Sequence, residues 1–410
     1  MHPHSVLTRS HSQLLLDRVR AWCDAGGGTA DQPAVDALLE RIAAEALAPL
    51  AGAVERVGLP AVADLDARGR AASTPLCAAA VARKRADAPF RVLLNIHADT
   101  VHGPEASAVP VRVEGDRLIG PGVADARGGI AVMLGGLERF EAAATQRQKQ
   151  RLGWTVVLNP DEEIGSPGSA GLLAEEARRH HAALLFEPSL PDGSLVGARG
   201  GSSRWSIGFR GRAAHAGRDF AAGRSAVHAA CAAVAAMVEL NDRPGCTFNC
   251  GAVDGGGPAN AVADAAVLRL NTRAADRDAE AAAEAAVRGA AAAAAHRFGV
   301  EVEVLRVAHA PPRPAAGATA TLLDAARDAV EAASGARPGL RETGGVCDGN
   351  RIAAAGCPVV DTLGVRGDHI HTGEEYLVID SLQERADATA RLLLRLADGG
   401  EALLNPRTAA

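Results

Sequence analysis

This chain of 410 residues lacks the sequence signals that direct a protein to a membrane or across one. Residues 1–10 are polar and contain no apolar segment of the signal-peptide type, and no apolar run approaches the length of a membrane span. Basic clusters are missing as well, and the net charge is -6, which argues against a nucleic-acid partner. We therefore expect a cytoplasmic protein with neither a membrane nor a nucleic acid as its partner.

Cysteine is present but lacks the paired spacing of a metal or redox motif. None of the seven cysteines belongs to a C-x-x-C pair. Scattered thiols fit small side chains in a reducing compartment better than they fit a disulfide framework. The seven are Cys23, Cys77, Cys231, Cys246, Cys250, Cys347 and Cys357.

Two adjacent carboxylates, Glu162 and Glu163, are the most informative feature that is present. They follow an apolar run rich in β-branched residues, residues 154–158, which predicts a buried strand. Open α/β sheets bind their ligands at the carboxyl ends of strands. If one carboxylate binds a metal ion and the other faces the water beside it, the pair provides a Lewis acid site with its own general base.

Polar residues also follow a second predicted strand, residues 91–96, which is succeeded by His97 and Asp99. Side chains two residues apart on an extended chain point to the same side. His97 can then bind a metal ion while Asp99 accepts the second ring N–H and fixes the tautomer. A core histidine paired with a carboxylate is the alternative, and these two residues alone favour that alternative.

A glycine-rich turn, residues 120–129, carries Asp125 and precedes a helix-like segment. Its glycines permit the sharp backbone turn that would aim this carboxylate inward. The segment contains neither G-x-G-x-x-G nor G-x-x-x-x-G-K-[ST], so nucleotide binding is set aside. A surface turn between a strand and a helix is the alternative for this segment on its own.

Two further segments repeat the pattern of an apolar run followed by a metal-binding type of side chain. Glu187 ends the short run 182–186 just before a proline. His371, with His369 as a competitor, follows the run 358–364. Five separate segments thus place His, Asp or Glu after a predicted strand, and chance does not readily explain that order.

With these motifs the chain resembles the M20 family of metallopeptidases and N-acyl amino acid amidohydrolases, in its glutamate carboxypeptidase and acetylornithine deacetylase branch. The resemblance spans most of the chain, because it is carried by segments 97–99, 122–129, 161–166, 187–188 and 371–375. It implies that Glu162 is the general base and that Asp99 orients a metal-binding histidine. It further implies two Zn²⁺ ions bridged by Asp125, one bound also by His97 and Glu187 and the other by Glu163 and His371. Co²⁺ or Mn²⁺ can substitute, because such a ligand set selects weakly between metals.

The region from about residue 199 to 307 has a different pattern, in which strands alternate with two alanine-rich helices, expected near 223–240 and 276–298. In the family this region is a lid, inserted in the catalytic domain, that usually forms a homodimer. The resemblance gives His215 the role of stabilising the oxyanion and implies that it can do so in the partner's active site. A lone histidine is otherwise more often structural.

The resemblance also implies substrate-binding residues in and beside the lid. Asn260 and Arg273 match lid residues that hold the carboxylate or acyl end of a substrate, a task that suits the arginine fork. Arg313 is expected to join them, with a solvated surface arginine as an equal alternative. The glycine-rich segment 342–350, which includes Gly345, is expected to line the pocket with backbone N–H groups.

Two residues of that segment depart from the family pattern. Val346 and Cys347 stand where relatives often carry a small Gly, Ser or Thr, which changes the pocket shape that we expect. Cys347 assisted by His371 or His369 is also a rival nucleophile. That mechanism would leave the oriented carboxylates without a task, so we do not favour it.

We predict an α/β fold in which a catalytic α/β sandwich with a largely parallel central sheet, residues 1–197 and 309–410, is interrupted by an α+β lid, residues 198–308. The predicted function is carboxypeptidase-like hydrolysis, by a di-zinc enzyme, of an amide bond in a small N-acyl amino acid or dipeptide. A deacetylase, desuccinylase or aminopeptidase of the same family is the second candidate. The third is a non-catalytic dimeric homologue that only binds ligands, and retention of Glu162 with all five candidate metal ligands argues against it.

Overall fold

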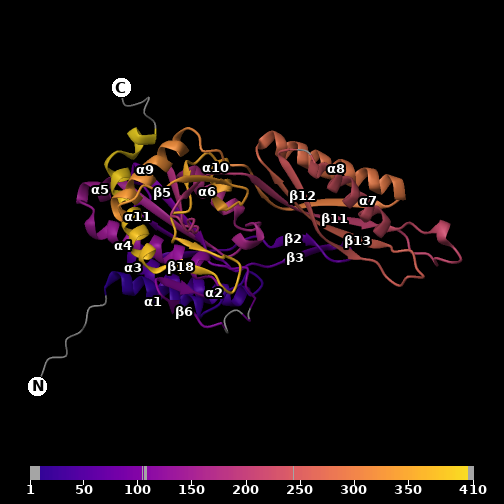
Figure 1. Ribbon diagram of the computed structural model, residues 1–410, viewed down its shortest axis with the longest axis horizontal. Coiled ribbons are helices and arrows are strands. Elements are labelled where there is room, and N and C mark those ends of the chain that lie inside the picture. Colours follow the sequence, from indigo (N-terminus) through magenta and orange to yellow (C-terminus); the bar gives the residue numbers. More distant parts are fainter. Residues whose placement is uncertain (1–9, 104, 106–108, 243, 405–410) are drawn as a thin grey trace, which may run out of the picture.

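The computed structural model describes residues 10–103, 105, 109–242 and 244–404, which form a larger lobe and a smaller, elongated lobe (Figure 1). In the larger lobe, β8, β5, β9 and β16 pair in parallel, whereas β4 is antiparallel to both of its neighbours. The expected parallel centre is therefore confirmed, within a mixed sheet. The order across this sheet is β1 (Val54–Val57), β4 (Ala79–Lys84), β8 (Leu152–Asn159), β5 (Phe90–His97), β9 (Ala182–Leu185) and β16 (Val359–Val360).

Helices cover both faces of this sheet because its central strands are apolar on both sides. Along β5, Val92, Leu94 and Ile96 point into one core and Leu93 points into the other. Each buried aliphatic side chain of this kind stabilises the fold by about 1.5–3 kcal/mol. The first core is closed by α1 (His11–Cys23), α2 (Gln32–Ile42), α4 (Gly129–Ala143), α9 (Ala318–Ser334) and α11 (Ile379–Leu404), and the second by α6 (Ala170–Arg179) and α10 (Asp348–Ala354).

The smaller lobe, called the lid below, is an antiparallel sheet with two helices on one face. Trp205, Ile207 and Phe209 alternate along β11 and pack beneath α7 (Ala226–Val238) and α8 (Arg277–Phe298). Both alanine-rich helices occur where the sequence predicts them, whereas the predicted domain limits stay a prediction. The strand order is β12 (Cys246–Gly255), β13 (Ala265–Ala274), β11 (Gly201–Arg210) and β14 (Glu301–Ala310).

A hairpin that the sequence analysis did not anticipate joins the two lobes. Strands β2 (Val62–Leu65) and β3 (Ala71–Thr74) leave the larger lobe between β1 and β4 and reach the lid (Figure 1). Asp64 Oδ1 accepts hydrogen bonds from Ser206 Oγ (2.5 Å) and Arg269 Nη1 (2.7 Å). Because Ser206 lies between Trp205 and Ile207 on an extended strand, the hairpin covers the sheet face that α7 and α8 leave open.

Short elements complete the described part of the chain. None of its helices combines the length and the apolarity that a bilayer crossing requires. The remaining strands are β10 (Leu195–Arg199) paired with β15 (Leu340–Thr343), and a small sheet of β17 (Gly367–Asp368), β18 (Tyr376–Val378), β7 (Arg117–Ile119) and β6 (Arg112–Glu114). The short helices are α3 (Ala48–Ala51) and α5 (Gln146–Arg151).

Candidate active site

The candidate metal ligands come together at the carboxyl ends of the parallel strands. His97 is the last residue of β5 and pairs in register with Asn159, the last residue of β8. A 3₁₀ turn, Glu162–Ile164, follows β8 and carries both adjacent glutamates. Glu187 follows β9, while Asp125 comes from the turn before α4 and His371 from the loop between β17 and β18. The sheet therefore places side chains from five segments at one edge.

Asp125 lies between the two candidate histidine ligands. His97 Nε2 is 3.0 Å from Asp125 Oδ1, and His371 Nε2 is 3.3 Å from Asp125 Oδ2. On the first side, Glu187 Oε2 is 3.8 Å from His97 Nε2, and on the second side Glu163 Oε2 is 3.3 Å from His371 Nε2. Each oxygen of Asp125 thus faces one histidine, and each of these histidines faces one further carboxylate, so the cluster has two adjoining halves.

Hydrogen bonds and burial shift the pKa values in this cluster. Burial lowers the pKa of His97, but hydrogen bonds with Asp125, Asp99 and Glu187 outweigh it and raise that pKa well above its ordinary value. Hydrogen bonds with Asp125 and Glu163 raise the pKa of His371 to about 10. Carboxylates outnumber histidines here, so the cluster stabilises positive charge at its centre.

Asp99 holds both His97 and the glutamate turn in place. Its main-chain oxygen is 3.0 Å and its Oδ1 3.3 Å from His97 Nδ1. Its carboxylate accepts hydrogen bonds from the backbone N–H groups of Glu162 (3.1 Å) and Glu163 (3.2 Å) and from the Thr29 hydroxyl (2.6 Å). One fully buried carboxylate therefore fixes the histidine ring and the turn that carries the two glutamates.

The turn that carries Asp125 is fixed by a residue to which the sequence analysis gave no role, Glu375. Its Oε1 accepts hydrogen bonds from the backbone N–H groups of Ala124 and Asp125 (2.8 Å each), and its Oε2 accepts one from Gly122 (2.9 Å). Gly122 has a φ of 73°, which explains why the turn needs glycine there. The position of Glu375 four residues after His371 in the same motif was the available signal.

A cavity of about 520 Å³ opens above the cluster, between the two lobes. The larger lobe contributes Gly345, Val346 and Cys347, three of the residues expected in the pocket wall. Cys347 is buried, and burial raises the pKa of its thiol well above the ordinary value. A thiol that stays protonated is a poor nucleophile, which argues against the rival cysteine mechanism.

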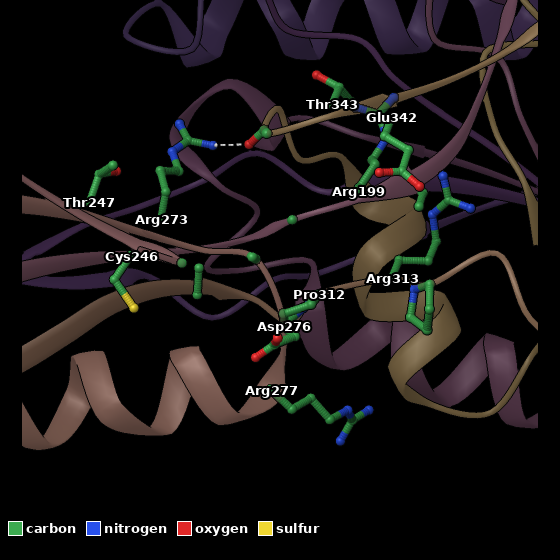
Figure 2. Close-up of a pocket in the computed structure, with 18 of the residues that line it drawn as sticks. Arg199, Cys246, Thr247, Arg273, Asp276, Arg277, Pro312, Arg313, Glu342 and Thr343 are labelled. Carbon is green, nitrogen blue, oxygen red and sulfur yellow. Dashed lines mark hydrogen bonds between the residues drawn. The ribbon is translucent and has the colours of Figure 1, made fainter. Parts of the chain in front are cut away.

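Arg273 of the lid lies in the wall of this cavity and also lines a second cavity of about 1010 Å³, which Figure 2 shows. Its Nη1 donates to the carbonyl of Gly344 in the larger lobe (3.2 Å), and its Nε donates to Asn271 Oδ1 (2.8 Å). Arg199, Glu342 and Thr343 also border both cavities. These residues form the partition between the catalytic cavity and the outer one.

Arg313 lies inside the protein and also lines the second cavity. Its side chain is fully buried, and its Nη2 donates to Asp361 Oδ2 (2.6 Å). Its Nη1 donates to the carbonyl of Gly197 (3.0 Å). This burial excludes the alternative of a solvated surface arginine, because Asp361 neutralises the guanidinium inside the protein. The predicted role of Arg313 toward the substrate stays a prediction. Arg199 pairs with the same carboxylate through Nε (2.8 Å) and was not anticipated.

His215 and Asn260 lie beside each other in the lid but are not among the described residues that line the catalytic cavity. The N–H of Ala216 donates to the carbonyl of Asn260 (2.8 Å), and His215 Nδ1 accepts from the N–H of Gly217 (3.1 Å). Both side chains are exposed. Their predicted roles toward the substrate stay predictions.

Comparisons with known proteins agree with this geometry. A family model described as Peptidase family M20/M25/M40 matches residues 93–395. Carboxypeptidase G2 of a Pseudomonas species is 31% identical over 313 residues, which cover 75% of this chain and 74% of that protein. A putative succinyl-diaminopimelate desuccinylase of Mycobacterium tuberculosis is 31% identical over 77% of this chain and 85% of its own length. The solved structure of an M20 family metallo-carboxypeptidase from Sulfolobus solfataricus has the same fold, with a TM-score of 0.72 and 14% identity over 94% of this chain and 99% of that one.

Proposed function

Since the chain belongs to peptidase family M20 and is an amide-bond hydrolase of that family, we propose that it is a di-zinc enzyme that cleaves small N-acyl amino acids or dipeptides. The proposal includes a free carboxylate on the amine side of the substrate, as in a carboxypeptidase. The observation that carries it is the position of Asp125, whose two oxygens lie 3.0 Å from His97 and 3.3 Å from His371. That arrangement suits a carboxylate that bridges two cations.

The donor set fits zinc. His97, Asp125 and Glu187 would hold one ion, and Asp125, Glu163 and His371 the other. Nitrogen and oxygen donors without a thiolate are typical of catalytic zinc sites, although Co²⁺ or Mn²⁺ can occupy such a set. Glu163 Oε1 is buried and has no hydrogen-bond partner among the described residues, as expected for an oxygen that is meant for a cation. Bound zinc would polarise the scissile carbonyl and lower the pKa of a water molecule.

Glu162 is proposed as the general base. Both glutamates line the cavity, and Glu163 also contacts His371. Burial raises the pKa of Glu162 well above its ordinary value, with the nearby Glu187 adding to the effect. A base with a raised pKa can take a proton from the attacking water and return it to the leaving amine nitrogen. The Asp99 carboxylate accepts hydrogen bonds from the backbone N–H groups of both glutamates, and it thereby fixes the turn that carries their side chains.

We extend the proposal to a homodimer in which His215 stabilises the oxyanion in the partner's active site. His215 is exposed and lies apart from the described lining of its own cavity, so a role in catalysis needs a second chain. Edge strand β12 exposes Val253 (43%). An exposed apolar side chain on a sheet edge suits contact with another copy.

A deacetylase or desuccinylase is the second candidate function, because one relative carries a desuccinylase name. In that case the acyl group rather than the released amino acid decides which substrate is cleaved. Both candidates use the same metal cluster and the same base.

Hydrolysis of N-acetyl, N-benzoyl, N-succinyl and dipeptide substrates by zinc-loaded protein tests the proposal, with Glu162→Gln as the central variant. We expect turnover that falls about 10²-fold to 10⁴-fold in this variant, the usual contribution of a general base, at unchanged zinc content. Glu163→Gln is the matched comparison at the adjacent position, and it should lose zinc as well as activity. Full activity in Glu162→Gln would refute the assigned base, and the best substrate decides between the two candidates.

A further inference from the structure

The turn that carries the two adjacent glutamates, residues 161–166, is held by arginines from both lobes. From the larger lobe, Arg351 donates a hydrogen bond from Nη2 to the carbonyl of Gly165. From the lid, Arg204 donates one from Nη1 to the carbonyl of Ile164, the preceding residue. Two neighbouring carbonyls of one turn therefore receive guanidinium groups from different lobes, and the second contact depends on where the lid lies.

A strand of the lid also packs directly against this turn. Gly165 has a φ of 87°, and a Cβ atom at this position would lie 2.9 Å from the Cβ of Ala308 in the lid. Ala308 is the cross-strand partner of Arg204 in the pairing of β11 with β14. The lid thus meets the turn through one pair of facing residues, at a distance that leaves no room for a side chain at position 165.

The lid sheet is irregular at this same pair. Arg204 lies opposite Ala308, whereas the next residue, Trp205, lies opposite Arg306, so β14 contains one extra residue here, Val307. A β-bulge of this kind changes the direction of nearby side chains and is frequent beside active sites. The irregularity therefore falls at the point where an arginine of the lid reaches the turn.

The guanidinium of Arg204 has no ion pair that would explain its position. Asp64, the carboxylate of the hairpin, pairs instead with Arg269 (2.7 Å) and accepts a hydrogen bond from Ser206 (2.5 Å). Among the residues that the structure describes, the carbonyl of Ile164 is the one hydrogen-bond acceptor of the Arg204 side chain. The contact with the turn is thus what holds this half-buried side chain in place.

The carboxylate of Glu162 depends on the same turn for its position. No residue in the described part of the chain donates a hydrogen bond to this carboxylate, whereas that of Glu163 is also held by His371, at 3.3 Å. The N–H of Gly165 donates to the carbonyl of Glu162 (2.7 Å), which closes the turn. A displacement at Ile164 is therefore passed on to Glu162 through the backbone.

We propose that Arg204 is a positioning residue through which the lid sets the position of the general base. It acts through the carbonyl of Ile164 rather than on the substrate. The inference rests on the proposed function, because it takes Glu162 as the base. Asp99 and Arg351 hold the turn from within the larger lobe, so Arg204 is the contact that makes proton transfer depend on the orientation of the lid.

Arg204→Met removes the hydrogen bond and keeps an apolar side chain of similar length. We expect kcat of the zinc-saturated variant to fall about 10-fold to 100-fold, the usual cost of a misplaced catalytic group, with KM changed less than about 3-fold. Arg204→Lys should recover part of the lost kcat, because an ammonium group can still donate to the carbonyl. Arg210→Met at the end of the same strand removes an arginine that pairs with Glu303, and it should keep the wild-type kcat. A loss that falls on KM alone would assign Arg204 to substrate binding and overturn the inference.

Combination with Glu162→Gln separates positioning of the base from a general effect on the lid. If Arg204 acts through Glu162, Arg204→Met should lower the residual rate of Glu162→Gln by less than about 2-fold, although it lowers the wild-type rate about 10-fold or more. Loss by the same factor in both backgrounds would overturn this inference and leave the proposed base in place. Full activity in Glu162→Gln would instead defeat the proposed function.

Amide hydrogen exchange tests the contact without a measurement of activity. The N–H groups of Gly165 and Ser166 donate to the carbonyls of Glu162 and Asp161 within the turn. In the zinc-loaded protein they should exchange about 10-fold faster in Arg204→Met than in the wild type, as expected for the loss of one charged hydrogen bond. The amides that pair β12 with β13 should keep their wild-type rates. Equal exchange of the turn in both proteins, or faster exchange throughout the lid sheet, would overturn the inference.

Discussion

Glu375 accepts a hydrogen bond of 2.8 Å from the backbone N–H of Asp125, although 250 residues separate the two in the chain. The same oxygen accepts the N–H of Ala124, and the other oxygen accepts that of Gly122. Glu375 is fully buried, so these N–H groups have no water to replace it. The orientation of the proposed bridging carboxylate therefore depends on a residue that binds no metal itself.

Glu375→Gln is expected to weaken zinc binding about 10-fold to 100-fold, which is typical for loss of a group that orients a metal ligand. The amide of glutamine turns one acceptor into a donor that faces backbone N–H groups. Competition with a chromogenic chelator measures the affinity. Glu374→Gln is the control, because Glu374 is exposed and pairs with Arg112 at the surface. Equal zinc affinity in the two variants would contradict the role of Glu375.

The division of the cluster into two halves predicts its metal stoichiometry. We expect the wild-type chain to bind two zinc ions and His371→Ala to bind one tightly, because that variant keeps the half formed by His97, Asp125 and Glu187. Metal analysis after dialysis measures the ratio. His369→Ala should still bind two, since His369 packs against Tyr376 instead. Two tightly bound ions in His371→Ala would sink the assignment of this ligand.

The proposed role of His215 across a dimer predicts that two inactive variants restore each other. In a mixed dimer of Glu162→Gln with His215→Ala, one site combines an intact Glu162 with the partner's intact His215. Random exchange makes half of the dimers mixed, and each has one of two sites complete, so about a quarter of wild-type activity should return. Native mass spectrometry confirms the exchange. No recovery in a mixture that has exchanged, or a protein that is monomeric, would refute the trans role.

The buried carboxylate of Asp361 balances Arg199 and Arg313 beneath the pocket wall. Asp361→Asn leaves two buried guanidinium groups without a counter-charge, and we expect the free energy of unfolding to fall by about 3–5 kcal/mol. Denaturant unfolding measures the loss. Asp328→Asn removes a surface carboxylate that pairs with Arg395, and it should cost no more than about 1 kcal/mol. A similar small loss in both variants would contradict the assigned charge balance.

The stability of Asp361→Asn should depend on pH differently from that of the wild-type protein. Burial raises the pKa of Asp361, but Arg199 and Arg313 outweigh burial and hold it below the ordinary value. A carboxyl whose pKa is lower in the folded state stabilises the protein above its unfolded pKa of about 3.9, and this contribution is lost as the pH falls through the folded pKa. The stability gap between wild type and Asp361→Asn is therefore full at neutral pH and should narrow below about pH 4. A gap that stays constant into that range would show that the ionised carboxylate is not its source.

The sequence was sufficient to predict which polar residues lie at the carboxyl ends of the central strands, because each of them directly follows a recognisable apolar strand. His97, Glu163 and Glu187 meet for that reason. Arg313 shows the limit of this reasoning. Its proline-rich surroundings are typical of a surface turn, yet a carboxylate 48 residues later draws it into the interior. No local pattern names such a partner, and the same holds for Glu375 and for the hairpin residue Asp64.

The hairpin has a consequence for how the chain folds during its synthesis. Asp64 leaves the ribosome about 200 residues before Arg269, its partner in the lid. The contact of the strand pair with Arg269 must therefore wait until more than half of the lid has been translated. Contacts of such long range slow folding, because the entropy of closing the loop is lost before the contact stabilises the chain. A lid fragment of residues 199–312 expressed alone would also expose the sheet face that the hairpin covers. A fragment that is meant to fold alone therefore needs residues 58–76 fused to it, so that the hairpin can cover this face.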